Sequence, residues 1–156
     1  MADRRLGLAL RCLRPEPAAH RQPPQPQRHV LVVGATGLLG RAVVDHFGAL
    51  EGWAVSSIAR RELQGEHSSA HYQLDLTDAE QCRSVLGSAA ELATVTQVVF
   101  TALFRNDVWD PEERKVNLAM LQNVLTPMLG VARGLRHVDL MQGRKAYPSQ
   151  VRSCLN

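Results

Sequence analysis

The stretch His29-Val-Leu-Val-Val-Gly34-Ala-Thr-Gly37-Leu-Leu-Gly40 decides how this chain folds. Residues 29–33 form a short, β-branched, apolar run, which is typical of a strand buried on both faces. Three glycines follow at a spacing of three, and helically spaced apolar residues come next. The sequence therefore predicts a strand, a tight turn and an amphipathic helix. The predicted apolar stripe of this helix comprises Leu39, Val43 and Phe47, widened by Ala42 and Leu50.

Each glycine of the turn has a steric purpose. Gly34 permits φ values that other residues resist. At Gly37 the missing Cβ lets a pyrophosphate approach the backbone, and Gly40 lets the helix pack close to the strand. The first amides of the helix are unpaired and carry partial positive charge, which suits a phosphate. We therefore expect a dinucleotide here rather than a turn that holds no ligand, bound by Gly34, Thr36, Gly37, Leu38 and Gly40.

Apolar runs and helical stripes alternate through the rest of the chain. The pattern β-α-β-β-α-β-α-β predicts an α/β fold, a Rossmann-type doubly wound parallel sheet with helices on both faces, truncated after about the fifth strand. The connection after the second strand stays unresolved. Further strands are expected at 53–59, 70–74, 95–103 and 135–141. One helix should run from the N-cap Asp78 to about Leu86. A longer one should begin at Pro111, bury Leu118, Leu121, Val124 and Leu125, and end or bend at Pro127.

Length and composition fit one domain. The chain has 156 residues, 45% of them hydrophobic, and a net charge of +3, which does not argue for nucleic acid as a partner. Residues 1–28 are rich in proline and arginine and read as a disordered tail, followed by an incomplete dinucleotide-binding domain over 29–147 and an irregular tail over 148–156.

No apolar run approaches the ~20 residues that span a membrane. We expect a cytoplasmic protein with free thiols at its three cysteines, although the arginines of the tail leave mitochondrial targeting open. Oligomeric state stays open.

The end of the second strand indicates which dinucleotide is preferred. Domains that prefer NAD(H) usually place a carboxylate there, which hydrogen-bonds the ribose 2′-hydroxyl and repels a 2′-phosphate. This chain has Ile58-Ala59-Arg60-Arg61 instead, and guanidinium groups match phosphate in geometry and charge. We predict NADP(H) as cofactor, with Arg60 and Arg61 gripping the 2′-phosphate. The alternative is a solvated basic turn. Thr101 and Ala102, at the end of the fourth strand, should lie beside the cofactor ribose.

The segments GATGLLG, ARRE, QLDLTD, VNLAMLQNVL and LMQGRKAY, in this order, resemble the progesterone 5β-reductase/iridoid synthase-like branch of the short-chain dehydrogenases/reductases, extended type. The resemblance covers about residues 29–147. It implies that Asp75 binds the adenine amino group, that Leu76 packs on the adenine ring and that Lys145 is catalytic. Members of the branch reduce enones or related carbonyl compounds with NADPH, and a tyrosine hydroxyl stabilises the enolate oxygen.

That tyrosine is expected well after the lysine segment, and the 156 residues do not include it. Tyr147 follows Lys145 by two residues and does not reproduce the Tyr-x-x-x-Lys arrangement of the superfamily. Whether the chain is an enzyme is therefore left open. We expect an NADPH-dependent oxidoreductase with weak or no activity as it stands, acting on a small enone or carbonyl compound if active. The alternatives are a non-catalytic NADP(H)-binding or regulatory module and a poorly folding fragment.

The remaining candidate residues point to no further site. His67 and His71 are four apart in a serine-rich, irregular stretch, so no metal site is predicted. Trp109 is expected to border a substrate pocket, to pack in the core or to anchor a loop.

Overall fold

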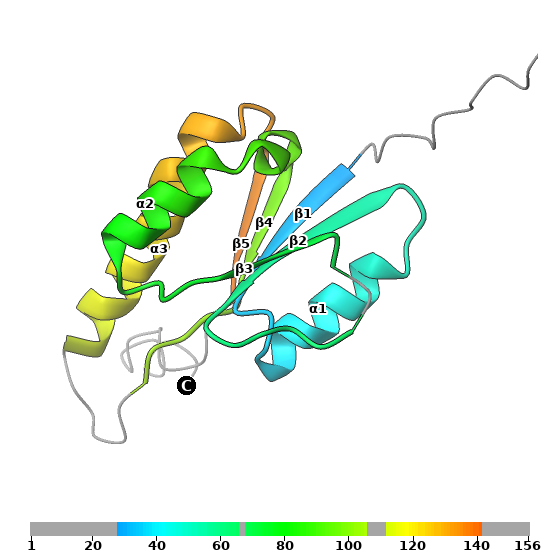
Figure 1. Ribbon diagram of the computed structural model, residues 1–156. Coiled ribbons are helices and arrows are strands. Elements are labelled where there is room, and N and C mark those ends of the chain that lie inside the picture. The colour runs from blue at the N-terminus through cyan, green and yellow to red at the C-terminus, as the bar shows by residue number, and fades with distance from the viewer. Residues whose placement is uncertain (1–27, 66–67, 106–111, 142–156) are drawn as a thin grey trace, which may run out of the picture.

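The computed structural model describes residues 28–65, 68–105 and 112–141 of this chain. Within these ranges five parallel strands form one sheet in the order β3-β2-β1-β4-β5 (Figure 1). Residues 1–27, residues 148–156 and the segment with Lys145 lie outside the described residues, whereas Arg28, assigned to the predicted tail, is the first residue of β1. The strands are β1 (Arg28–Val33), β2 (Trp53–Ala59), β3 (Ala70–Gln73), β4 (Gln97–Phe100) and β5 (His137–Leu140).

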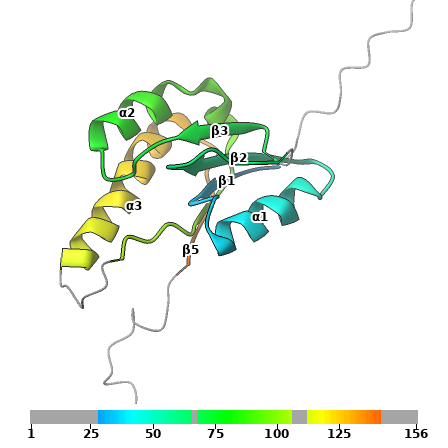
Figure 2. The ribbon, with the colours of Figure 1, turned by 60° about the horizontal axis from the view of Figure 1, so that its bottom comes forward.

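Helices cover both faces of the sheet. Figure 2 shows α1 (Leu38–Gly48) on one face and α2 (Ala79–Ser88) with α3 (Glu112–Val131) on the other. A short 3-10 helix, η1 (Ala90–Thr94), leads into β4 and was not expected from the sequence. The predicted element order and the Rossmann-type parallel sheet are confirmed. The unresolved connection joins β2 to β3, which pair in parallel.

The central strand β1 supplies both layers of the core. Leu31 and Val33 point toward α2 and α3, whereas Val30 and Val32 point toward α1. All four side chains are fully buried, as the apolar run predicts. The last residue of β1, Val33, pairs with β2 on one side and with β4 on the other. The carboxyl ends of the three central strands therefore meet at one edge.

The buried face of α1 differs from the predicted stripe. Leu39 is 52% exposed and Leu50 is also exposed, while Gly40 and Val44 are the buried residues. Val43 and Phe47 pack against the core as expected. The buried face of α1 is rotated relative to the predicted one because Gly40 must face the end of β1. In this position of the helix the side chain of Leu39 is exposed.

The interior of α3 also corrects the sequence interpretation. Val124 is buried and Leu121 and Leu125 pack against the core as predicted, but Leu118 is 55% exposed. Met120 and Met128 complete the buried face. Pro127 does not end the helix, which continues to Val131. Proline removes one backbone donor and crowds the carbonyl four residues earlier. Packing of Met128 and Ala132 in the core keeps the chain helical beyond it.

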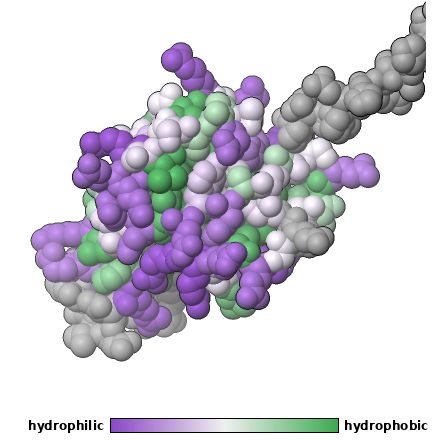
Figure 3. Space-filling model, in the orientation of Figure 1, coloured by the Kyte–Doolittle hydropathy of each residue, from purple (hydrophilic) through white to green (hydrophobic). Residues whose placement is uncertain are grey.

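One face of the molecule is seen in Figure 3. In the view of Figure 3, hydrophilic side chains cover most of the molecule, and apolar groups show between them. No helix in the described ranges is long and apolar enough to cross a membrane. The edge strand β5 carries exposed Val138 and Leu140.

His29, the second residue of β1, is a buried imidazole held between hydroxyl groups. Its Nδ1 lies 2.8 Å from Oγ1 of Thr94, and its Nε2 lies 2.9 Å from Oγ of Ser56. The Thr94 hydroxyl donates to the carbonyl oxygen of Glu91, so it accepts from an Nδ1–H. Burial lowers the pKa of His29, so the folded protein favours the neutral ring.

This burial predicts a loss of stability in mild acid. Because the pKa of His29 is lower in the folded than in the unfolded chain, the unfolded chain binds the extra proton first as the pH falls below about 6.5. The melting temperature of the unchanged protein should therefore fall between pH 7 and pH 5.5. The melting temperature of the His29→Gln variant should fall less over the same range. His46→Gln, at an exposed position of α1, should retain the slope of the unchanged protein. Equal slopes in all three proteins would contradict the assignment.

Candidate functional site: the carboxyl edge of the sheet

The glycine-rich turn leaves β1 and is tied to the neighbouring strand. Gly34 has φ +87°, a conformation that residues with a side chain rarely adopt. The amides of Gly34 and Ala35 both donate to the carbonyl oxygen of Ile58 in β2, at 2.8 and 3.1 Å. The amide of Gly37 donates to the carbonyl oxygen of Gly34 at 3.0 Å. The turn is thus a fixed backbone frame.

The end of β4 closes tightly on this frame. The Thr101 hydroxyl donates to the carbonyl oxygen of Val33 at 2.8 Å. A Cβ built on Gly34 would lie 2.7 Å from the Ala102 nitrogen, and one on Gly40 would overlap the Gly34 carbonyl oxygen. Gly34 and Gly40 are therefore required sterically, as the sequence predicts. The Thr101 side chain braces the turn, and this was not foreseen.

The first turn of α1 points its amides out of the frame. Gly37 is the N-cap residue and makes no side-chain cap hydrogen bond, and the first intrahelical bond is from the Arg41 amide to the Gly37 carbonyl oxygen at 2.8 Å. The amides of residues 38–40 make no hydrogen bond within the described part of the chain. Leu38 is 90% exposed beside them. The arrangement provides donors and the positive helix end for an anion.

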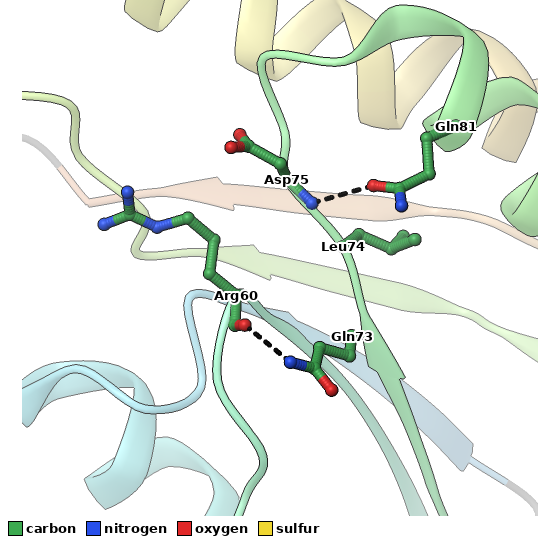
Figure 4. Close-up of a pocket in the computed structure, with 5 residues that line it drawn as sticks. All are labelled: Arg60, Gln73, Leu74, Asp75 and Gln81. Atoms are coloured by element: carbon green, nitrogen blue, oxygen red, sulfur yellow. Dashed lines mark hydrogen bonds between the residues drawn. The ribbon is translucent and has the colours of Figure 1, made fainter.

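Arg60 and Arg61 follow β2 and are both exposed, but they line different depressions. Arg60 lines one of about 340 Å³ with Gln73, Leu74, Asp75 and Gln81 (Figure 4). Arg61 lines another of about 480 Å³ with Thr36, Arg41, Glu62, Leu63 and Gln64. The two arginines, adjacent in sequence, thus border separate depressions.

The turn after β3 presents Asp75 at the same edge. Its Oδ1 accepts from the Thr77 amide at 3.0 Å and from the Thr77 hydroxyl at 2.8 Å. These bonds, with a smaller contribution from the charge of Arg60, hold the pKa of the Asp75 carboxyl below its usual value. No hydrogen bond in the described ranges involves Oδ2, so an ionised acceptor is presented to the depression.

Leu76 is placed differently from the expectation. It is 5% exposed and belongs to the core cluster beneath α2 and α3, so its side chain has little surface to offer an adenine ring. Its carbonyl oxygen accepts from Nδ2 of Asn123 in α3 at 2.9 Å. Leu76 therefore anchors the Asp75 turn from below, and ligand contact there would fall to its backbone.

The structure adds one positioning residue that the sequence interpretation missed. Asn117 of α3 pairs with both backbone groups of Phe104: its Oδ1 accepts from the amide and its Nδ2 donates to the carbonyl, each at 2.8 Å. This holds the segment that follows Thr101 and Ala102. The sequence feature that could have indicated this role is the amide side chain of Asn117 on the same helix as the apolar residues Val116 and Met120. A polar side chain on a packed helix face needs a hydrogen-bond partner.

Several candidate residues are settled or fall outside the described ranges. His71 hydrogen-bonds Ser57 Oγ at 2.9 Å and the Arg61 carbonyl oxygen at 3.0 Å, so it has a structural role. His67, Trp109 and Lys145 lie outside the described residues. In the part of the chain that the structure describes, no cluster of three or more His, Cys, Asp or Glu could hold a metal ion.

Comparison with known proteins gives a consistent result. The sequence model of the NAD dependent epimerase/dehydratase family matches residues 30–139. The chain is 32% identical over 124 residues to the 3-oxo-Delta(4,5)-steroid 5-beta-reductase of Arabidopsis thaliana, covering 75% of this chain and 31% of that protein. It is 28% identical over 128 residues to an (S)-8-oxocitronellyl enol synthase of Camptotheca acuminata, covering 78% of this chain and 32% of that protein. The resemblance to the 5β-reductase-like branch is confirmed, and the chain spans about a third of the length of these curated relatives.

Solved structures agree on the fold. A short chain dehydrogenase family protein from Francisella tularensis superimposes with a TM-score of 0.65 at 16% identity, over 79% of this chain and 54% of that one. A UDP-N-acetylglucosamine 4-epimerase from Bacillus cereus gives a TM-score of 0.58 at 21% identity, over 80% of this chain and 41% of that one. At these identities the likeness shows the shared architecture.

Two glycine substitutions should differ in their effect on stability. Gly40→Ala places a methyl group against the Gly34 carbonyl oxygen and Thr101 Oγ1, so we expect a loss of roughly 1–3 kcal/mol in the free energy of unfolding. Gly37→Ala has an ordinary φ of −79° and meets only the Gly34 oxygen at 3.3 Å, so stability should change little. Chemical denaturation measures both. A Gly40→Ala protein as stable as the Gly37→Ala protein would refute the steric account.

Proposed function

Because the chain belongs to the NAD dependent epimerase/dehydratase family, we propose that it binds NADP(H) for the reduction of an enone or related carbonyl compound. The family is NAD(P)-dependent, and we propose that this chain prefers the phosphorylated dinucleotide. Support for the substrate class comes from the similarity to a steroid 5-beta-reductase.

The observation that carries the proposal is the charge at the end of β2. Arg60 and Arg61 follow the strand directly, and no carboxylate stands at its end to accept from a ribose 2′-hydroxyl. The nearest one, Glu62, follows both arginines and is exposed. A 2′-phosphate would therefore meet positive charge rather than a carboxylate, and charge-assisted bonds to guanidinium groups are among the strongest polar contacts.

Other residues at the carboxyl edge of the sheet are proposed to contact the remaining parts of the cofactor. The amides of residues 38–40 suit the pyrophosphate, and the ionised Asp75 offers Oδ2 to the adenine amino group. Thr101 and Ala102, which follow β4, would lie beside the cofactor ribose. When bound, the cofactor supplies a hydride. The glycine-rich turn, whose backbone is already hydrogen-bonded in the absence of ligand, would orient the cofactor.

Dinucleotide selectivity tests this proposal. Isothermal titration of the 156-residue chain should give a Kd for NADP+ lower than that for NAD+ by on the order of tenfold or more, which is the effect of a charge-assisted hydrogen bond. The difference should narrow as salt is raised, since the contact is partly exposed. Arg133→Ala, beyond α3 at the opposite end of the sheet, is the control and should leave both values unchanged. Equal Kd values for NADP+ and NAD+ in low salt would contradict the proposed preference for NADP(H).

A specific observation favours a second candidate function for the 156 residues as they stand, namely binding without turnover. Tyr72 is the sole tyrosine of the described ranges, and its hydroxyl is buried against the core. Burial, and then the charge of Glu91, raise the pKa of Tyr72 to about 12. Tyr72 lines neither of the two depressions at the carboxyl edge, so it is not placed to act as the tyrosine that the resemblance implies. Lys145, which the resemblance makes catalytic, lies outside the described residues.

Steady-state kinetics distinguishes the two functions. With NADPH and small enones, we expect oxidation of NADPH by this chain to stay at the rate of a no-enzyme control, while saturable NADPH binding raises the melting temperature. Turnover well above the control would establish the reductase and reject the binding module. In that case Lys145→Met should reduce kcat.

A further inference from the structure

We propose that the outer edge of β5 pairs with β5 of a second copy of this chain, in antiparallel orientation and with the two Val138 residues opposite each other. β5 is the last strand at one edge of the sheet, next to β4 (Figure 1). Within the described ranges no strand lies on its outer side. The proposal concerns association of the chain, so it does not rest on the proposed cofactor or reaction.

The backbone of β5 presents hydrogen-bonding groups to this outer side. The amides of His137 and Met141 donate to carbonyl oxygens of the β4 segment, at 3.3 and 2.9 Å, and so face inward. In a parallel ladder alternate residues bond to the same neighbouring strand. The amides and carbonyls of Val138 and Leu140 therefore face away from β4. A row of such groups at an edge is a template for pairing with another strand.

The register with β4 divides the side chains of β5 between the two faces of the sheet. Val138 and Leu140 pair with residues of β4 that belong to the core layer under α2 and α3. His137 and Asp139 therefore point to the other face, on the side of α1. Although they lie on the α3 face, Val138 and Leu140 remain 43% and 41% exposed.

The two edges of the sheet differ in this respect. Of the two outer strands described, only β5 has large apolar side chains that are exposed. Proteins usually protect an edge strand with charged side chains, proline or a covering segment. Pairing at β5 would bury apolar surface and satisfy backbone groups at the same time, whereas pairing at β3 would bury little apolar surface.

The polar side chains of β5 favour a second copy of the same strand as the occupant. The Asp139 carboxylate makes no hydrogen bond or ion pair within the described ranges, and Nδ1 of His137 lies 3.3 Å from the carbonyl oxygen of Arg136. In an antiparallel pair centred on Val138, His137 of each copy lies directly opposite Asp139 of the other. An imidazole opposite a carboxylate is a favourable cross-strand pair, because a ring N–H donates to the carboxylate. The two-fold symmetry forms this pair twice.

Other registers of the same strand are less favourable. A pair centred on Asp139 would place two carboxylates opposite each other, and like charges in that position destabilise a sheet. A shift by a single residue would move the apolar side chains of one copy to the wrong face. Centring on Val138 also lets the outward amide and carbonyl of this residue bond to those of the other copy. The two sheets then continue one another, with both α3 helices on the same face.

The association should be weak, because β5 has four residues and a pairing of this length buries less area than a stable dimer needs. We expect a transient dimer with a Kd in the micromolar range. Sedimentation velocity of the 156-residue chain over about a hundredfold range of concentration measures it. The weight-average sedimentation coefficient should rise with concentration.

Charge variants test the pairing of His137 with Asp139. Asp139→Lys and His137→Asp should each raise the dimer Kd by about tenfold or more, since neither homodimer keeps a base opposite an acid. An equimolar mixture of the two variants should associate as the unchanged protein does, because every mixed pair again has a base opposite an acid. Glu51→Lys is the control. It makes a matching change of charge in the exposed turn before β2 and should leave the Kd unchanged.

Hydrogen exchange locates the contact. The amides of Val138 and Leu140 should be protected at concentrations where the dimer is populated and should exchange freely on dilution. Val138→Pro removes the outward amide and keeps the hydrogen bonds to β4, as proline does at strand edges. This variant should be monomeric, with an unchanged circular dichroism spectrum.

Three results would overturn the proposal. The first is a chain that stays monomeric over the whole range of concentration. The second is protection of the Val138 and Leu140 amides in the monomer, which would show that a segment of the same chain covers β5. The third is association that persists in the Asp139→Lys and His137→Asp variants alone, which would place the contact on another surface.

Discussion

The close approach of three backbone segments at the end of β1 is the constraint on which the rest depends. Gly34 turns the chain with a positive φ, Gly40 lies directly against the Gly34 carbonyl, and the Thr101 hydroxyl donates to the carbonyl oxygens of Val33 and Gly34. Side chains at Gly34 or Gly40 would force the turn, the helix and β4 apart. This contact sets where α1 begins and therefore where its unpaired amides point. It also explains the rotated buried face of α1, because Gly40 rather than Leu39 must face the strands.

A second set of contacts holds the loops around this frame. Asn123 reaches the Leu76 carbonyl, Thr77 closes the Asp75 turn, and Asn117 pairs with both backbone groups of Phe104. Each satisfies backbone groups that would otherwise lose hydrogen bonds where the strands end. The edge is thus prepared for a ligand by the Asp75–Thr77 turn and by polar side chains of α3, a helix that lines neither depression.

The charges at this edge are arranged by strand geometry. Successive residues at a strand end project to opposite sides, so Arg60 and Arg61 enter different surroundings. One lies beside an ionised carboxylate, Asp75, and the other shares a space with Arg41 and Thr36. The same sequence dipeptide therefore supplies two chemically different contacts, one beside Asp75 and one beside a second cation.

The sequence by itself determined the element order, the parallel sheet and the glycine-rich turn. The reason is that these depend on short-range chemistry: an apolar β-branched run at 29–33, glycines where no Cβ fits, and Asp78 as an N-cap that accepts from the Glu80 and Gln81 amides. Only the tertiary structure decided the buried faces of α1 and α3, the burial of Leu76, and the separation of Arg60 from Arg61. These depend on how elements distant in sequence are rotated against one another. No local pattern could bring Arg41 of the first helix beside Arg61, because their proximity arises only when α1 packs beside the end of β2.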